Sequence, residues 1–205
     1  WNKIDKALER LDLAHEQAPQ KLYSQVGGKY IITNHSDGLI VIHQNRAHER
    51  ILFEKIRSSL DNKRVPSQQL LFPQAIQYSS SDYQIIKDLF PRLREVGFDL
   101  DEFGKNEIVV NGIPLYLENH AVDRVLEQLL EDEKDHRDAA ESEWHEMLAN
   151  RLAEASAIPV GNKMTQTEMA EMVDELFACQ SPYLSTRGKP VVLKMNIEDI
   201  DKSFD

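Results

Sequence analysis

Cysteine is almost absent from this chain, which has Cys179 as its one thiol in 205 residues. A single cysteine excludes a disulfide framework within the chain and any cysteine-rich zinc module. Long hydrophobic runs are missing too, because the longest, such as 38–42, have strand length and fall far short of a membrane span. We therefore expect a protein of the reducing cytoplasm with no membrane partner. The start at Trp1, without a charged-then-apolar leader, suggests a piece of a longer protein.

Basic residues and glycine are also scarce. The chain has 24 Lys and Arg against 35 Asp and Glu, a net charge of −11, and only 8 glycines. A surface this acidic cannot hold DNA by bulk electrostatics, so DNA contact would need a local basic patch or another domain. No glycine-rich phosphate loop appears. What remains is an ordinary globular composition, 41% hydrophobic and 29% charged, in a chain long enough for one core or two small ones.

The hydrophobic spacing predicts both strands and helices. A hairpin is indicated by the Asp37-Gly38 pair, Pro73 is expected to stop its strand, and Thr165 with Glu168 has the form of a capping box. We expect strands at 29–33, 39–43, 69–72, within 98–114 and at a buried 191–193, and helices at 46–60, 80–96, 121–134, 138–157 and from 165 on. Strand-rich first and last parts flank a middle insertion, which predicts an α+β fold with a discontinuous domain.

The hexapeptide 68–73 has the form Q-x-L-L-x-P. It resembles the short motif by which bacterial proteins dock on the sliding clamp of replication. A Gln amide can hydrogen-bond at the mouth of a groove, two leucines can fill apolar pockets, and proline limits the entropy of the segment. We expect clamp binding by Gln68, Leu70, Leu71 and Pro73. The alternative is an ordinary edge strand with alternating core residues.

The segment 38–54 reads G-L-I-V-I-H-Q-N-R-A-H-E-R-I-L-F-E. It resembles the C-terminal domains of bacterial MutL-type mismatch repair proteins, in which a strand leads into a helix that begins D-Q-H-A-x-x-E-x-x-x-x-E. The matching positions are Gln44, Ala47, Glu49, Arg50, Ile51, Leu52 and Glu54. Further blocks at 27–32, 69–73, 93–114 and 165–190 resemble the family in the same order, so that the resemblance covers nearly the whole chain from about Tyr23 to Met195.

The resemblance implies a homodimer that couples to the sliding clamp, and to MutS and mismatched DNA through the full-length protein. It implies an inner dimerisation subdomain at 20–62 plus 146–205, an inserted outer regulatory subdomain at 63–145, and the end of a linker at 1–19. ATP would be bound by an N-terminal domain that is not in this chain, so we expect no cofactor here.

Nicking members of that family hold Zn or Mn with the Asp and His of D-Q-H-A, the following Glu, and later Cys and His groups, and such a metal can activate water. The resemblance places His43, Asn45, Glu154, Ser185 and Arg187 at the Asp, His, Cys, Cys and His positions of this set. Of the usual ligands Glu49 remains, with Glu54 in the helix behind it. We therefore expect this degenerate motif (His43, Asn45, Glu49, Glu54) to bind no metal and to lack nicking activity.

Two alternatives stay open for the same residues. A metal site rebuilt from His43, Glu49 and Glu154, with His48 nearby, would make the domain a metal-dependent endonuclease, although His48 and Glu49 point about 100° apart on a helix. A small basic patch could instead contact DNA phosphates, through Arg46, Arg50, Arg187 and Lys189.

Overall fold

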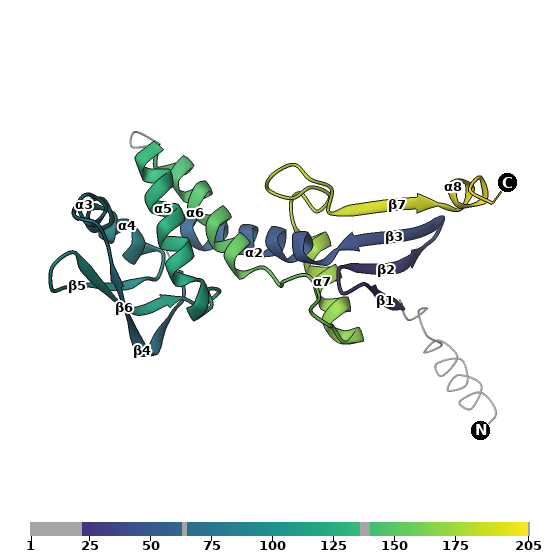
Figure 1. Cartoon of the computed structure of the whole chain (residues 1–205). Helices are drawn as coiled ribbons and strands as arrows, with labels where there is room; N and C mark the ends of the chain where they lie inside the picture. Colours follow the sequence, from purple (N-terminus) through teal and green to yellow (C-terminus); the bar gives the residue numbers. More distant parts are fainter. Residues whose placement is uncertain (1–21, 63–64, 136–139, 205) are drawn as a thin grey trace, which may run out of the picture.

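The computed structural model describes residues 22–62, 65–135 and 140–204, so the expected linker end at 1–19 lies outside the described residues. Two antiparallel sheets lie toward opposite ends of an elongated molecule, joined by helices (Figure 1). The elements are β1 (Tyr23–Val26), β2 (Tyr30–His35), β3 (Gly38–His43), α2 (Gln44–Asp61), β4 (Ser67–Gln77), α3 (Ser80–Asp88), α4 (Phe90–Glu95), β5 (Asp99–Phe103), β6 (Glu107–Pro114), η1 (Asn119–Ala121), α5 (Val122–Asp135), α6 (Glu141–Ser156), α7 (Gln166–Ala178), β7 (Val192–Asn196) and α8 (Ile197–Asp201). The predicted α+β class is confirmed.

The inner sheet has the strand order β1-β2-β3-β7. The predicted hairpin is confirmed, since β2 and β3 pair from Tyr30↔His43 to His35↔Gly38. Gly38 has φ +151°, and a Cβ there would lie 2.0 Å from the Met195 carbonyl oxygen, so no side chain fits where β3 meets β7. One face of the sheet buries Ile31 and Ile42 against Met169, Met172, Val173 and Leu176 of α7. The predicted capping box fixes the start of α7.

The outer sheet has the order β4-β6-β5 and belongs to a larger core. This core includes α3, α4, α5, most of the buried face of α6 and the second half of α2. Helix α2 therefore serves both cores, with Ala47 and Ile51 in the inner one and Leu52, Ile56 and Leu60 in the outer one (Figure 1). Its packing against α6 joins the two halves. The subdomain limits expected near 62/63 and 145/146 stay a prediction.

Three local predictions were wrong. Pro73 does not stop its strand, because β4 is an edge strand whose pairing with β6 shifts register between Gln69 and Gln74, where a proline costs no ladder hydrogen bond. The helix expected at 80–96 is two helices, α3 and α4, with Pro91 in the first turn of the second. The strand after 191 is buried only at its start: Leu193 is 57% exposed.

Candidate functional site

The degenerate motif lies where β3 runs directly into α2. His43 ends the strand and is the N-cap of the helix, since its Nδ1 accepts from the Arg46 amide at 3.4 Å. Its ring also makes an edge contact with Tyr30, with 5.5 Å between ring centroids. Burial, and then the charges of Arg46 and Lys29, lower the pKa of His43 below its ordinary value. The neutral imidazole thus uses one nitrogen to cap a helix.

Asn45 and His48 fasten α2 to the segment that follows α6. The Asn45 amide donates to the Ile158 carbonyl at 2.9 Å, and His48 Nδ1 accepts from the Ile158 amide at 3.0 Å. Burial lowers the pKa of His48. Both side chains therefore satisfy the two backbone groups of a single residue. Asn45 and His48 thus have a structural role, because they connect α2 to the segment that follows α6.

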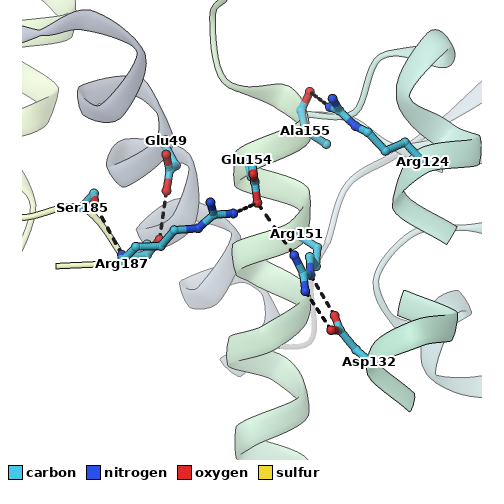
Figure 2. Close-up of polar contacts among 9 residues, drawn as sticks. Glu49, Arg124, Asp132, Arg151, Glu154, Ala155, Ser185 and Arg187 are labelled. Carbon is cyan, nitrogen blue, oxygen red and sulfur yellow. Dashed lines mark hydrogen bonds and ion pairs between the residues drawn. The ribbon is translucent and has the colours of Figure 1, made fainter. Parts of the chain in front are cut away.

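Glu49 and Glu154 face a cleft of about 370 Å³ that is formed by α2, α6 and the loop before β7 (Figure 2). Glu49 Oε1 accepts from the Thr186 hydroxyl at 3.0 Å. Glu154 forms an ion pair with Arg187 and lies 3.9 Å from Arg151. The structure thus brings these two carboxylates to one cleft, as the rebuilt-site alternative requires, but it also brings a guanidinium to each side of Glu154.

The loop before β7 is a tight turn centred on Ser185, which is 6% exposed. Its Oγ accepts from the amides of Arg187 and Lys189 at 3.3 and 3.2 Å, and its own amide donates to the Lys189 carbonyl at 2.8 Å. This is the place where the resemblance expected a Cys and a His. Here the serine closes the turn and Arg187 extends from it into the cleft.

These residues do not fit a divalent cation. Within 22–62, 65–135 and 140–204, no three His, Cys, Asp or Glu side chains are arranged to hold a metal ion. His43 does not line the cleft of Glu49 and Glu154, and the Arg187 guanidinium is always charged. Glu54 is used elsewhere: it accepts from the amides of Gln180 and Ser181 at 2.7 and 3.3 Å.

Most of the four basic side chains that were expected to form a DNA-binding patch make hydrogen bonds or ion pairs within the protein. Arg46 donates to the Pro190 carbonyl at 2.7 Å, and Arg50 donates to the Ser181 carbonyl at 3.0 Å while pairing with Glu54. Arg187 pairs with Glu154. Lys189 is the member of the set that is exposed and has no side-chain partner in the described part of the chain. DNA contact by this set stays a prediction.

The clamp-like motif lies on the edge strand of the outer sheet, where the ladder is interrupted. Pairing passes from Gln69↔Gly112 directly to Gln74↔Val110, so residues 70–73 leave the ladder together. The side chains of Leu71 and Phe72 are 86% and 77% exposed. The other motif positions are partly engaged, because Gln68 donates to the Leu117 carbonyl at 3.1 Å and Leu70 packs on the outer core.

A third surface lies on the inner sheet and includes β7, the strand that the sequence analysis expected to be buried. Side chains alternate across a strand, and the face of the inner sheet that points away from α7 is apolar. The register Ile32↔Val41↔Leu193 and Leu39↔Met195 aligns these residues across three strands. Leu39, Leu193 and Met195 are 37%, 57% and 38% exposed. The signal for this face in the sequence is the alternation of apolar and polar residues at 193–196.

Comparison with known proteins identifies the fold's family. The profile described as "MutL C terminal dimerisation domain" matches residues 23–164. This chain belongs to the MutL C-terminal dimerisation domain family. The predicted resemblance is thereby confirmed. The loop with Ser185 and Arg187 lies beyond the matched residues.

Relatives named DNA mismatch repair protein MutL match most of this MutL-type domain. The protein of Flavobacterium johnsoniae is 38% identical over 189 residues, which are 92% of this chain and 29% of that protein. Those of Christiangramia forsetii and Chloroherpeton thalassium are 35% and 33% identical, over 93% and 88% of this chain and 31% and 28% of theirs. The chain thus spans about three tenths of the length of these relatives. Of the helices described, none has the length and apolar character needed to cross a membrane.

Proposed function

We propose that this domain holds two copies of its chain together in DNA mismatch repair and couples them to the sliding clamp, without a nicking activity of its own. The observation that carries the proposal is the apolar face of the inner sheet. Leu39, Val41, Leu193 and Met195 form one patch over β3 and β7 that no described element covers. Such a face is typical of a self-complementary interface between two identical subunits.

The exposed bulge of β4 supports the clamp part of the proposal. Leu71 and Phe72 are presented to solvent at an interruption of an edge strand, which suits recognition of an apolar segment by a groove. The bulge belongs to the outer sheet and the apolar face to the inner one, so both surfaces can be used at once (Figure 1). The full-length protein would supply ATP binding and contact with MutS and mismatched DNA, in the cytoplasm.

The absence of nicking is supported by the contacts of the degenerate motif. His43 caps a helix, Asn45 holds a carbonyl, and Glu154 is paired with a fixed cation. The experiment combines metal content with nicking of supercoiled plasmid in the presence of Mn²⁺. We expect no bound metal and intact plasmid. Stoichiometric metal, together with nicking that disappears in Glu49→Ala, would overturn this part and establish the rebuilt site.

Clamp binding is tested by Leu71→Ala with Phe72→Ala, measured as affinity for purified sliding clamp. We expect affinity to fall at least about tenfold, because the two side chains supply the exposed apolar contact. Phe103→Ala is the matched control, since Phe103 is 57% exposed on the same sheet but outside the motif. An equal loss in both variants, or none in either, would contradict docking by this bulge.

A further inference from the structure

We propose that Arg187 is a tethered cation that latches the two halves of the domain together across the cleft between α2 and α6. This inference concerns the internal geometry of one chain and does not depend on the clamp or on the dimer. The resemblance to nicking members of the family would place a metal cation in this cleft. Here the positive charge is supplied by the Arg187 side chain instead.

The contacts form a continuous series of ion pairs from the loop before β7 to α5 (Figure 2). Arg187 pairs with Glu154 on α6, and Glu154 lies 3.9 Å from Arg151, one turn earlier on the same helix. Arg151 then binds Asp132 of α5 with two N–H donors, both at 2.8 Å. Three elements that are separate in sequence are therefore joined by alternating charges.

The two ends of this series of ion pairs belong to different cores. Its loop end is fastened to α2 by Thr186, whose hydroxyl donates to Glu49, and by Arg46, which donates to the Pro190 carbonyl at 2.7 Å. Val191, one residue further, is buried in the inner core. At the other end, Asp132 follows Leu129 and Leu130 of the outer core. The ion pairs thus span the joint between the two halves.

Burial decides which link is strong. The side chains of Asp132 and Arg151 are 14% and 30% exposed and meet in a two-point contact, which is the geometry that makes an ion pair effective. Arg187 and Glu154 are 54% and 37% exposed, so their link is more strongly screened by salt. The latch is therefore anchored on α5 and α6 and is released first at Arg187.

The test is a distance measurement between two spin labels on the full chain. Ser36→Cys, in the turn between β2 and β3, and Lys105→Cys, in the turn between β5 and β6, carry the labels in a Cys179→Ala background. Labelled chain is diluted with unlabelled chain so that only distances within one chain are recorded. We expect a single narrow distribution in the parent chain and a broader one in Arg187→Met and in Glu154→Gln.

Lys189→Met is the matched control, because it removes an exposed cation from the same loop and should leave the distribution narrow. Arg187→Lys keeps a positive charge at this position and should retain most of the narrow distribution, which separates loss of the ion pair from a general folding defect. An unchanged distribution in Arg187→Met, or equal broadening in Lys189→Met, would overturn the proposal. Broadening in Arg187→Lys as large as that in Arg187→Met would do the same.

Discussion

The two sheets of this domain each leave one face open, but they leave different chemistry on it. The open face of the outer sheet carries hydrogen-bonded polar pairs: Gln69 donates to Asp99 at 3.2 Å and Asn111 donates to Asp101 at 2.8 Å. The open face of the inner sheet is apolar across β2, β3 and β7. A polar face is satisfied by water, whereas an apolar face gains free energy when it is covered. This face of the outer sheet is therefore satisfied within one chain, whereas the open face of the inner sheet would gain free energy from a partner.

The largest expected effect is a loss of stability when the core of the outer half is changed. Leu126 on α5 is fully buried there. Leu126→Ala should lower the free energy of unfolding by about 3 kcal/mol, through lost burial and a residual cavity. Urea denaturation measures it. Phe103→Ala, which removes an exposed ring, should change it by less than about 0.5 kcal/mol. If Leu126→Ala and Phe103→Ala lowered the free energy of unfolding equally, the assignment of Leu126 to the core and Phe103 to the surface would be wrong.

The next effect concerns the open face of the inner sheet. Leu193→Asp puts a charge at the centre of the proposed interface, and the dimer dissociation constant should rise at least about 100-fold, or about 2.7 kcal/mol. Sedimentation equilibrium measures it. Lys194→Asp introduces the same residue on the opposite face of β7 and should leave the constant within about threefold. If both variants weakened the dimer alike, the apolar face would not be the interface.

A smaller effect tests the helix that supports the inner sheet from its covered side. The Thr165 hydroxyl accepts from the Glu168 amide at 3.3 Å in the capping box of α7. Thr165→Ala should cost about 1 kcal/mol of unfolding free energy. Thr165→Ser keeps the acceptor and should recover most of it. Thermal unfolding measures both, and identical stability of the Ala and Ser variants would exclude the capping contribution.

The smallest effect is a dependence on pH. Burial, followed by the charge of Lys55, lowers the pKa of His48, while Glu175 acts in the opposite direction. The unfolded chain therefore binds more protons near the ordinary pKa of histidine, and stability is present above about 6.5 and is lost as the pH falls below it. One such group changes stability by no more than about 1.4 kcal/mol per pH unit. The slope should be smaller in His48→Gln, measured by urea denaturation at several pH values; an unchanged slope would exclude His48.

Much of the fold could be predicted from the sequence, because it depends on local signals. The hairpin at Asp37-Gly38 and the capping box at Thr165 are set by turn and cap chemistry within a few residues. The continuation of β4 past Pro73 could not be predicted, since it depends on which strand lies at the edge of the sheet. Position in a sheet is a property of the whole chain.

The same distinction applies to the candidate site. The sequence predicted that Asn45, Ser185 and Arg187 are poor partners for a metal, because that follows from residue type. It did not predict what they bind, since Ile158 and Glu154 lie more than 100 and 30 positions away from Asn45 and Arg187, respectively. The exposure of Leu193 within one chain was not predicted, because a short apolar strand looks the same whether protein or solvent faces it.

The central claim is that the open apolar face of the inner sheet joins two copies of the chain. The most direct test is the mass in solution over a range of micromolar concentrations, by sedimentation equilibrium. The account predicts a species of twice 23.6 kDa for the parent chain. A parent chain that stays at 23.6 kDa at every concentration would contradict it.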